Sequence, residues 1–245
     1  MPELAATGLI ALAFALVHIL GPRLSFLTTV PRSIWLSGAG GVSVAYVFVH
    51  ILPDLALHQR GVEAQLEAEG GMLGAVESHV WLVALLGLVL FYGLERLARR
   101  TARRRSVESA AQDSTFWIHL GSFAAYNLLI GYLLLHRDGE AQGGLVTYAL
   151  ALGLHFLVND QGLREHHGPA YDRFGRWLLA VAPVAGWAAG AASDVPELLV
   201  SALFGFLAGG IVLNVLKEEL PEDRESRFWA FAAGAAGYAA LLLAA

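Results

Sequence analysis

The sequence predicts an all-α, polytopic membrane protein: a bundle of eight membrane-spanning helices with both termini outside. Of the 245 residues, 56% are hydrophobic and only 15% are charged. Soluble domains carry about 25% charged residues, so this composition indicates a chain that lies in lipid. The chain also contains a series of apolar runs, each close to the roughly 20 residues that a helix needs to cross a bilayer. We therefore interpret residues 1–245 as a single transmembrane domain.

The apolar runs divide the chain into eight predicted spans. These spans cover about residues 4–21, 33–52, 78–97, 115–135, 144–163, 174–192, 196–216 and 227–244. The first run follows MPEL rather than a basic segment, so we expect a retained span and not a cleaved signal peptide. The chain has no cysteine, which excludes disulfides and thiolate metal ligands.

Two longer segments are expected outside the bilayer, namely the insert 53–78 and a basic cytosolic loop at 98–113. The arginines of the loop either fix the topology or, as the alternative, also contact anionic lipid. With the N-terminus outside, all of the 16 Lys and Arg residues except Arg60 and Arg137 fall in inner loops. This excess predicts outside termini in a multi-pass protein of the plasma (inner) membrane.

Small residues recur at positions where two spans can pack closely. Gly186 and Gly190 are four residues apart, as are Gly205 and Gly209, and GAGG and AAGAAGYAA occur in the second and last spans. Lipid gives no hydrophobic drive for helix association, so close backbone contact has to provide it. We expect these segments to be helix interfaces, either static or sliding.

Asp160 is the one acidic residue that lies well inside a predicted span. A carboxylate there costs about 2.5–3.5 kcal/mol on insertion scales, so it should face protein or water. The short loop between the fourth and fifth spans predicts that these helices are antiparallel neighbours, with Tyr126 and Asn127 at the depth of His155. The predicted transport site is thus Tyr126, Asn127, His155, Asn159 and Asp160. His18 and His50 are expected near span ends, where a polar ring costs little.

Imidazole and carboxylate groups of this kind suit zinc, iron or manganese. The alternative is that they only form hydrogen bonds between helices. That alternative is favoured for Tyr126, and the two interpretations are equally supported for Asn127. A functional site is favoured for His155, Asn159 and Asp160, because ionisable groups inside a membrane are functional by default.

Five segments carry a family resemblance: GGVSVAYVFVHILPDL (40–55), HVWLVALLGLVLFYGLERL (79–97), YNLLIG (126–131), HFLVND (155–160) and FLAGGIVLNVLKEELPE (206–222). In order and spacing they resemble spans two, three, four, five and seven of the ZIP (Zrt/Irt-like) family of divalent metal transporters. YNLLIG stands in the place of the family's HNxxDG, and HFLVND in the place of its HExPHE. Tyr126 and Ile130 replace the fourth-span histidine and acid, so the resemblance is to a divergent member. It implies a degenerate metal site of His155, Asn159, Asp160 and Asn127.

The resemblance implies a transporter that moves a divalent cation of the zinc, manganese or iron class, most expectedly zinc, toward the cytosol by alternating access. Its pathway would pass His50 and Asp54 outside and Glu218 inside. The alternative is a ZIP-like protein that has lost metal transport and acts as a receptor, a regulator or a carrier of another solute.

An enzyme is not expected, because no HExxH or GxSxG motif occurs in any span, and no organic cofactor is implied. The expected partner is the lipid bilayer, and a homodimer is left open. Nucleic acid is not expected, because the net charge is −5 and no aromatic residues interleave the arginines of the basic loop.

Overall fold

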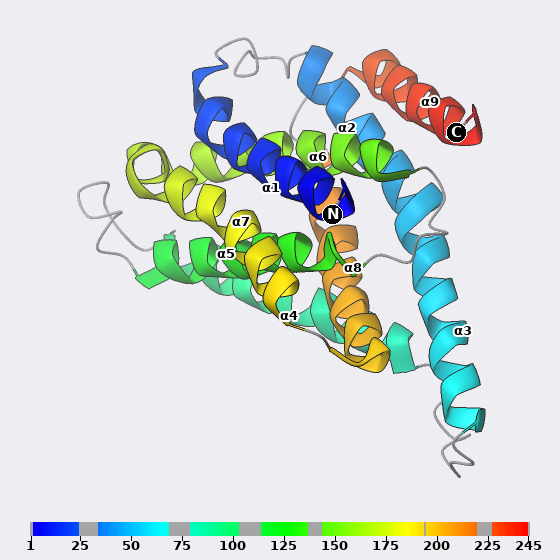
Figure 1. Ribbon diagram of the computed structural model, residues 1–245. Coiled ribbons are helices and arrows are strands. Elements are labelled where there is room, and N and C mark those ends of the chain that lie inside the picture. Colours follow the sequence, from blue (N-terminus) through cyan, green and yellow to red (C-terminus); the bar gives the residue numbers. More distant parts are fainter. Residues whose placement is uncertain are drawn as a thin grey trace.

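The computed structural model describes residues 2–24, 34–68, 79–102, 114–136, 144–193, 195–219 and 227–244. Within these ranges the chain is helical, with short turns and no strand. If the continuous segment from residue 34 to residue 68 is taken as one helix, eight helices form the bundle shown in Figure 1. The all-α prediction is confirmed for the described residues.

The elements follow the predicted spans closely. The first half of the chain contains α1 (Pro2–Leu20), the short 3-10 turn η1 (Gly21–Arg23), α2 (Ile34–Tyr46), the π-helix η3 (Val47–Ile51), α3 (Leu52–Ala68) and α4 (His79–Ala102). The second half contains α5 (Ser114–Leu133), α6 (Gly144–His167), the π-helix η5 (Tyr171–Gly175), α7 (Arg176–Ala192), α8 (Glu197–Glu219) and α9 (Phe228–Ala244).

Five helices among the described residues are long and apolar enough to cross a membrane, which indicates an integral membrane protein. They are α1, the continuous α2–η3–α3, α4, α5 and α8, while α9 is a shorter apolar helix. Helix α7 has only 17 residues. Helix α6 has the length of a span, but the polar residues of the predicted transport site lower its hydropathy. The count of eight spans stays a prediction.

The second helix is longer than the sequence predicts. Residues 53–68, expected to begin an insert outside the bilayer, continue the helix as α3, which extends beyond the rest of the bundle in Figure 1. Pro53 lacks an N–H, and a proline ring clashes with the carbonyl four residues earlier in an α-helix. The π-helix η3, where Leu52 N–H bonds to Val47 O, widens the preceding turn and lets the helix continue past Pro53.

Glycines hold three helix pairs in close backbone contact, as the small residues predict. A Cβ atom at Gly186 or Gly209 would collide with the carbonyl oxygen of Leu128 or Ala84 respectively, because α5 packs on α7 and α4 packs on α8. Similarly, the GAGG segment of α2 packs on α9, where a Cβ at Gly41 would meet the carbonyl oxygen of Phe231. At these glycine positions the interfaces have no room for a side chain.

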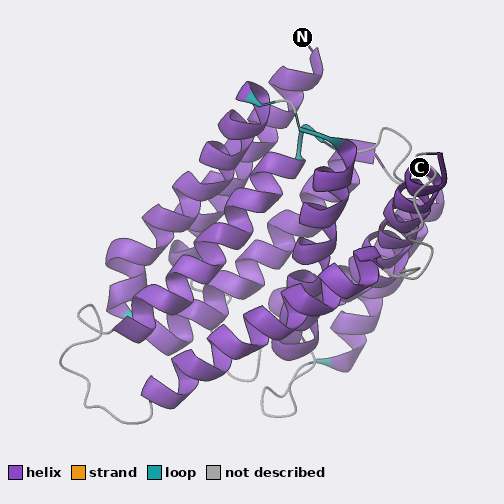
Figure 2. Ribbon diagram, turned by 90° about the horizontal axis from the view of Figure 1, so that it is seen from below, coloured by secondary structure: helices purple, strands orange, loops and turns teal. Residues whose placement is uncertain are grey.

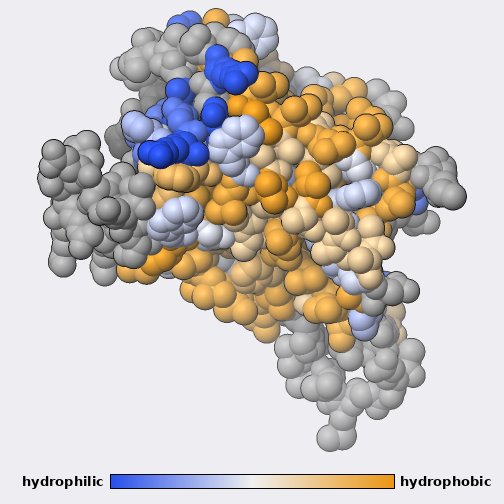
Figure 3. All heavy atoms as spheres, turned by 60° about the vertical axis from the view of Figure 1, so that its left-hand side comes forward, coloured by the Kyte–Doolittle hydropathy of each residue, from blue (hydrophilic) through white to orange (hydrophobic). Residues whose placement is uncertain are grey.

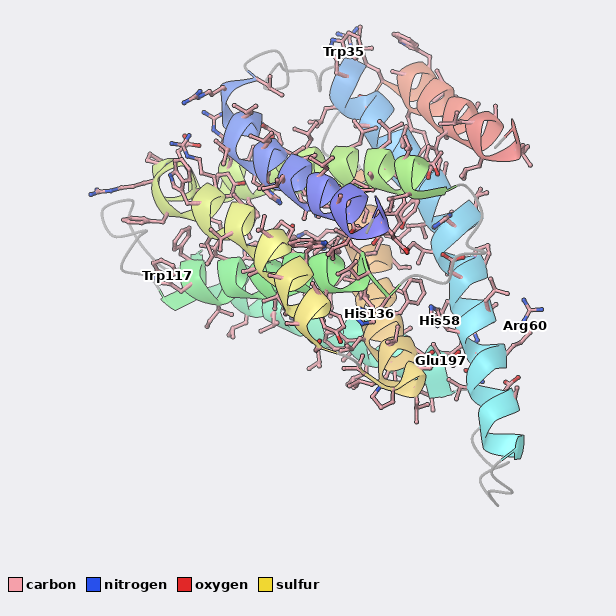
Figure 4. All side chains as sticks on the ribbon, in the orientation of Figure 1. Trp35, His58, Arg60, Trp117, His136 and Glu197 are labelled. Carbon is pink, nitrogen blue, oxygen red and sulfur yellow. The ribbon has the colours of Figure 1, made fainter. Side chains whose placement is uncertain are left out.

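Five helices begin with an exposed tryptophan. The residues stand within the first four positions of α2, α4, α5, α7 and α9: Trp35, Trp81, Trp117, Trp177 and Trp229. Figure 4 labels Trp35 and Trp117, and Figure 3 shows a largely hydrophobic face with hydrophilic atoms gathered at one end. Tryptophan collects at membrane–water interfaces, so these helix starts fit positions near the membrane surfaces. Figure 2 shows both termini toward one end of the bundle.

We expect Gly131→Ala to lower the stability of the protein. Its Cβ would meet the carbonyl oxygen of Pro183, a backbone atom that cannot move without separating α5 from α7. Overpacking of this kind costs about 1–3 kcal/mol. The matched control on the same helix is Gly121→Ala, where nothing lies within 4 Å of the added atom. Thermal unfolding in detergent measures both variants, and equal melting temperatures would contradict the assigned α5–α7 interface.

Candidate transport site

Side chains from three helices form an ion-pairing group inside the bundle. His18, near the end of α1, lies against Asp160 of α6, with Nδ1 at 2.9 Å from both carboxylate oxygens. The other ring nitrogen, Nε2, lies 3.0 Å from Oδ1 of Asn127 on α5. The three residues are 1%, 3% and 1% exposed, so neither the charge nor the hydrogen bonds are shared with solvent. The carboxylate that the sequence places at membrane depth is therefore paired.

The hydrogen bonds define where protons sit in this group. The amide nitrogen of Asn127 donates to the carbonyl oxygen of Phe123, so its oxygen is the atom that faces His18. Nε2 of His18 must therefore carry a proton and donate it to Asn127. Between Nδ1 and Asp160 one more proton is shared, either as an imidazolium with a carboxylate or as a neutral imidazole with a carboxylic acid. Either arrangement is neutral overall.

A second polar group surrounds the Tyr126 hydroxyl. His155 Nε2 lies 2.9 Å from that hydroxyl and 3.0 Å from Nδ2 of Asn159. Both neighbours can donate to Nε2, so the imidazole is neutral at this nitrogen and its proton is on Nδ1. Asn214 of α8 also interacts with the Tyr126 hydroxyl. This group joins α5, α6 and α8 beside the Asp160 group, since Tyr126 directly precedes Asn127 and Asn159 directly precedes Asp160.

Some buried polar atoms in this region have no well-aligned hydrogen-bond partner among the described residues. They include Oδ1 of Asn159 and the hydroxyl of Tyr171, at the start of η5. The Tyr171 hydroxyl nevertheless interacts electrostatically with the Asp160 carboxylate. Unsatisfied buried polar atoms are few in native proteins and commonly occur at functional sites. They indicate that this part of the bundle is arranged for more than static packing.

All five predicted transport-site residues are buried, but the structure divides them into two groups. Asn127 and Asp160 meet through His18, whereas Tyr126, His155 and Asn159 meet each other. His18 lies near the end of its span, as predicted. The expectation that a polar ring costs little there is wrong. Its ring is buried, because η1 and α6 cover the end of α1. The signal in the sequence was a lone histidine in an otherwise apolar span.

The predicted packing of α5 beside α6 is wrong, although their residues lie at matching depth. Helix α5 packs mainly against α7 and α4, and α6 packs mainly against α2 and α1. Side chains rather than close backbones connect the two, as in the contact between Tyr126 and His155 and in the cluster that contains Leu163. A short loop makes two helices neighbours in sequence, but glycine contacts with α7 decide where α5 packs.

The predicted outer pathway residues lie close together, with His50 buried and Asp54 half-buried. His50 Nε2 lies 3.3 Å from Asp54 Oδ2, and the pair spans the junction of η3 and α3. The His50 ring stacks on Tyr46, with ring centroids 5.0 Å apart. The side chain of Glu218, the predicted inner pathway residue, lies outside the described residues. The π-helix at His50 is a feature that the sequence analysis did not predict, and such turns are frequent at functional sites.

A third polar network links four helices near the other end of the bundle. Glu95 of α4 lies 2.7 Å from Nε2 of His119 on α5 and 2.8 Å from Nζ of Lys217 on α8. His119 Nδ1 is hydrogen-bonded to Nε2 of His167 on α6 at 2.9 Å. Glu95 and His119 are buried. The sequence analysis did not predict this network, because its members lie on four different spans.

Among the described residues, no three His, Asp or Glu side chains are arranged to hold a metal ion. The ring of His119 lies between Glu95 and His167, so these two side chains face opposite nitrogens. Asp160 has one imidazole beside it rather than two. A cation at Asp160 would complete its coordination with side-chain oxygens or water.

Comparison with protein-family models gave no match, and comparison with curated proteins gave none either. The ZIP resemblance therefore rests on the five segments of the sequence, and the metal site that it implies stays a prediction.

We expect Glu95→Ala to destabilise the protein, because it leaves Lys217 and His119 without their shared carboxylate. Removing one partner of a buried ion pair costs roughly 3 kcal/mol. Tyr92→Ala is the matched control, since Tyr92 lies one turn earlier on α4 and is 51% exposed. Thermal unfolding in detergent should show a lower midpoint for Glu95→Ala only. A midpoint equal to that of the control would mean that the network contributes nothing to holding the four helices together.

Proposed function

We propose that the protein is a ZIP-like membrane carrier that moves a divalent metal cation, of the zinc, manganese or iron class, toward the cytosol by alternating access. The observation that carries this proposal is the buried Asp160, paired with His18, whose other ring nitrogen is hydrogen-bonded to Asn127 where α1, α5 and α6 meet. A carboxylate inside a membrane bundle is costly, and it is kept where ions or protons have to bind.

The ligand chemistry supports the cation class. Imidazole nitrogen with carboxylate and amide oxygen is a donor set suited to zinc, manganese and iron. Asp160 supplies the negative charge, and His155 offers a neutral imidazole in the adjacent group. We propose Asp160, His155, Asn159 and Asn127 as the residues that receive the cation, and His50, Asp54 and Glu218 as its route.

A second candidate function has its own observation. Both oxygens of Asp160 are engaged by His18, and no set of three metal-ligating side chains is present among the described residues. These features favour a ZIP-like protein that has lost metal transport and serves as a receptor, a regulator or a carrier of another solute. A flux measurement separates the two candidates.

We further propose eight spans, outside termini and a plasma-membrane location. The absence of cysteine allows a direct test, because every introduced thiol is then unique. A membrane-impermeant maleimide added to intact cells should label Ser78→Cys, in the predicted outer insert, and should not label Ser106→Cys, in the basic loop. Labelling of Ser106→Cys should require opened membranes. The reversed pattern would invert the topology, and equal labelling would contradict the span count.

The transport proposal predicts zinc uptake by the purified protein in liposomes that contain a metal-sensitive dye. Uptake should saturate and exceed that of empty liposomes. Asp160→Ala should reduce the rate by more than about tenfold, because the loss of a group that holds or orients a metal weakens binding by about that factor or more. Manganese and iron should be tested in parallel.

Gly153→Ala is the matched control for this assay, because it lies on α6 and its added methyl group meets nothing within 4 Å. It should transport like the unaltered protein, and size-exclusion chromatography should show that both variants are folded. If correctly inserted protein transports none of the metals, the carrier proposal is contradicted and the second candidate is favoured. If Asp160→Ala transports metal at an undiminished rate, Asp160 is not part of the transport site.

A further inference from the structure

We infer that His18 is a ligand of the transported cation, so that the site lies between α1 and α6 and selects cations that bind imidazole. This inference rests on the proposed function and assigns to it a residue that neither the sequence motifs nor the family resemblance contains. In place of a metal-ligating residue on α5, where Tyr126 stands, the imidazole comes from α1.

The candidate ligand atoms of His18 and Asp160 already face each other. Nδ1 of His18 lies 2.9 Å from Oδ1 and 2.9 Å from Oδ2 of Asp160, which are hydrogen-bond distances. A metal ion at about 2.1 Å from both Nδ1 and the carboxylate oxygens fits only when the carboxylate lies roughly 1 Å further from the ring. Binding of a small cation between the two side chains therefore requires a shift of the Asp160 carboxylate.

Asn127 orients the imidazole for this role. Its Oδ1 accepts the Nε2 proton of His18 at 3.0 Å, and its amide nitrogen is fixed by Phe123 O at 2.8 Å. Histidine ligands of metals almost always donate their second N–H to a carbonyl or carboxylate, which fixes the tautomer and the ring plane. Asn127 holds Nε2 protonated and therefore directs the lone pair of Nδ1 toward Asp160. This inference changes the role that the proposed function gives to Asn127: both of its side-chain polar atoms are engaged, so it acts on the cation through His18, as a positioning residue and not as a ligand.

The surroundings of His18 keep it in place. Its ring lies against Phe156, with centroids 4.9 Å apart, and Phe14 meets Phe156 edge to face at 5.0 Å. Near the start of α1, the indole nitrogen of Trp187 donates to the Thr7 hydroxyl at 3.0 Å. These contacts anchor α1 to α6 and α7, so the imidazole is presented to Asp160 before any cation arrives. Preorganisation of this kind favours binding, because no side chain has to be ordered.

This donor set names the substrate class more narrowly than the proposed function does. Imidazole with one carboxylate suits zinc and neighbouring transition metals, whereas magnesium and calcium prefer oxygen ligands alone. A single carboxylate also offers less negative charge than an all-oxygen site for calcium commonly supplies. The geometry points to zinc-class cations and away from magnesium and calcium.

The test measures equilibrium binding of zinc and manganese to the purified full chain by isothermal titration calorimetry, alongside uptake in liposomes. His18→Ala should weaken zinc binding at least tenfold. His18→Asp replaces the imidazole with a carboxylate, so zinc binding should fall while the ratio of manganese to zinc affinity rises by tenfold or more. His136→Ala is the matched control, because it removes an imidazole stacked on Tyr132 just past the end of α5 (Figure 4).

The outcomes separate this inference from the proposed function. Wild-type zinc uptake with unchanged zinc affinity in His18→Ala would overturn the inference and leave the carrier proposal standing. If the wild-type protein neither binds zinc nor takes up metal, both the inference and the carrier proposal are overturned. If His18→Ala fails to fold by size-exclusion chromatography, His18→Asp decides, since an unchanged ratio of manganese to zinc affinity in that variant also overturns the inference.

Discussion

The structure depends on how it compensates Asp160. A lone carboxylate among apolar helices has no water to solvate it, so it must meet a positive charge, a shared proton or donors from other helices. His18 meets the carboxylate directly and Asn127 holds the other side of the His18 ring, and the two residues come from helices far apart in the sequence. The compensation therefore requires α1, α5 and α6 to meet at one place. It also fits the burial of α6 around Asp160, where residues 151–163 include no exposed residue.

Glycine backbone contacts and side-chain contacts hold different helices of the bundle together. Within the pairs α4–α8, α5–α7 and α2–α9, backbones touch at glycines, for example at Gly87 beside the Phe206 carbonyl. Helix α6 is held by apolar side chains such as Phe156 and Val158 and by hydrogen bonds, and its Gly153 meets no atom within 4 Å. Close packing gives rigid pairs, whereas long polar side chains connect helices whose backbones stay further apart. The candidate site therefore lies where the backbones leave room for side chains.

The sequence predicts the positions of the helices well, because apolar runs and glycine spacing are local properties that each span carries by itself. It also predicts that Asp160 is buried, since nothing in its own span can solvate it. It does not predict His18, because the partner of Asp160 lies 142 residues away and no local pattern identifies the facing helix. The packing of α5 is missed for a related reason: Gly131 and Gly186 decide it, and their complementarity becomes visible only when the two surfaces are opposed.

The same division bears on any change of shape. The pair α4–α8 carries Glu95 and Lys217, while His119 and His167 belong to α5 and α6. If the pair α4–α8 moved away from α5 and α6, the Glu95–His119 contact and the Tyr126–Asn214 interaction would break. The glycine contacts within each pair would stay intact. Hydrogen bonds and ion pairs can be replaced by water or by a bound ion as they open, whereas separated glycine surfaces leave a void. Movement between the pairs is therefore the less costly route to opening the bundle, and the polar networks lie across that route.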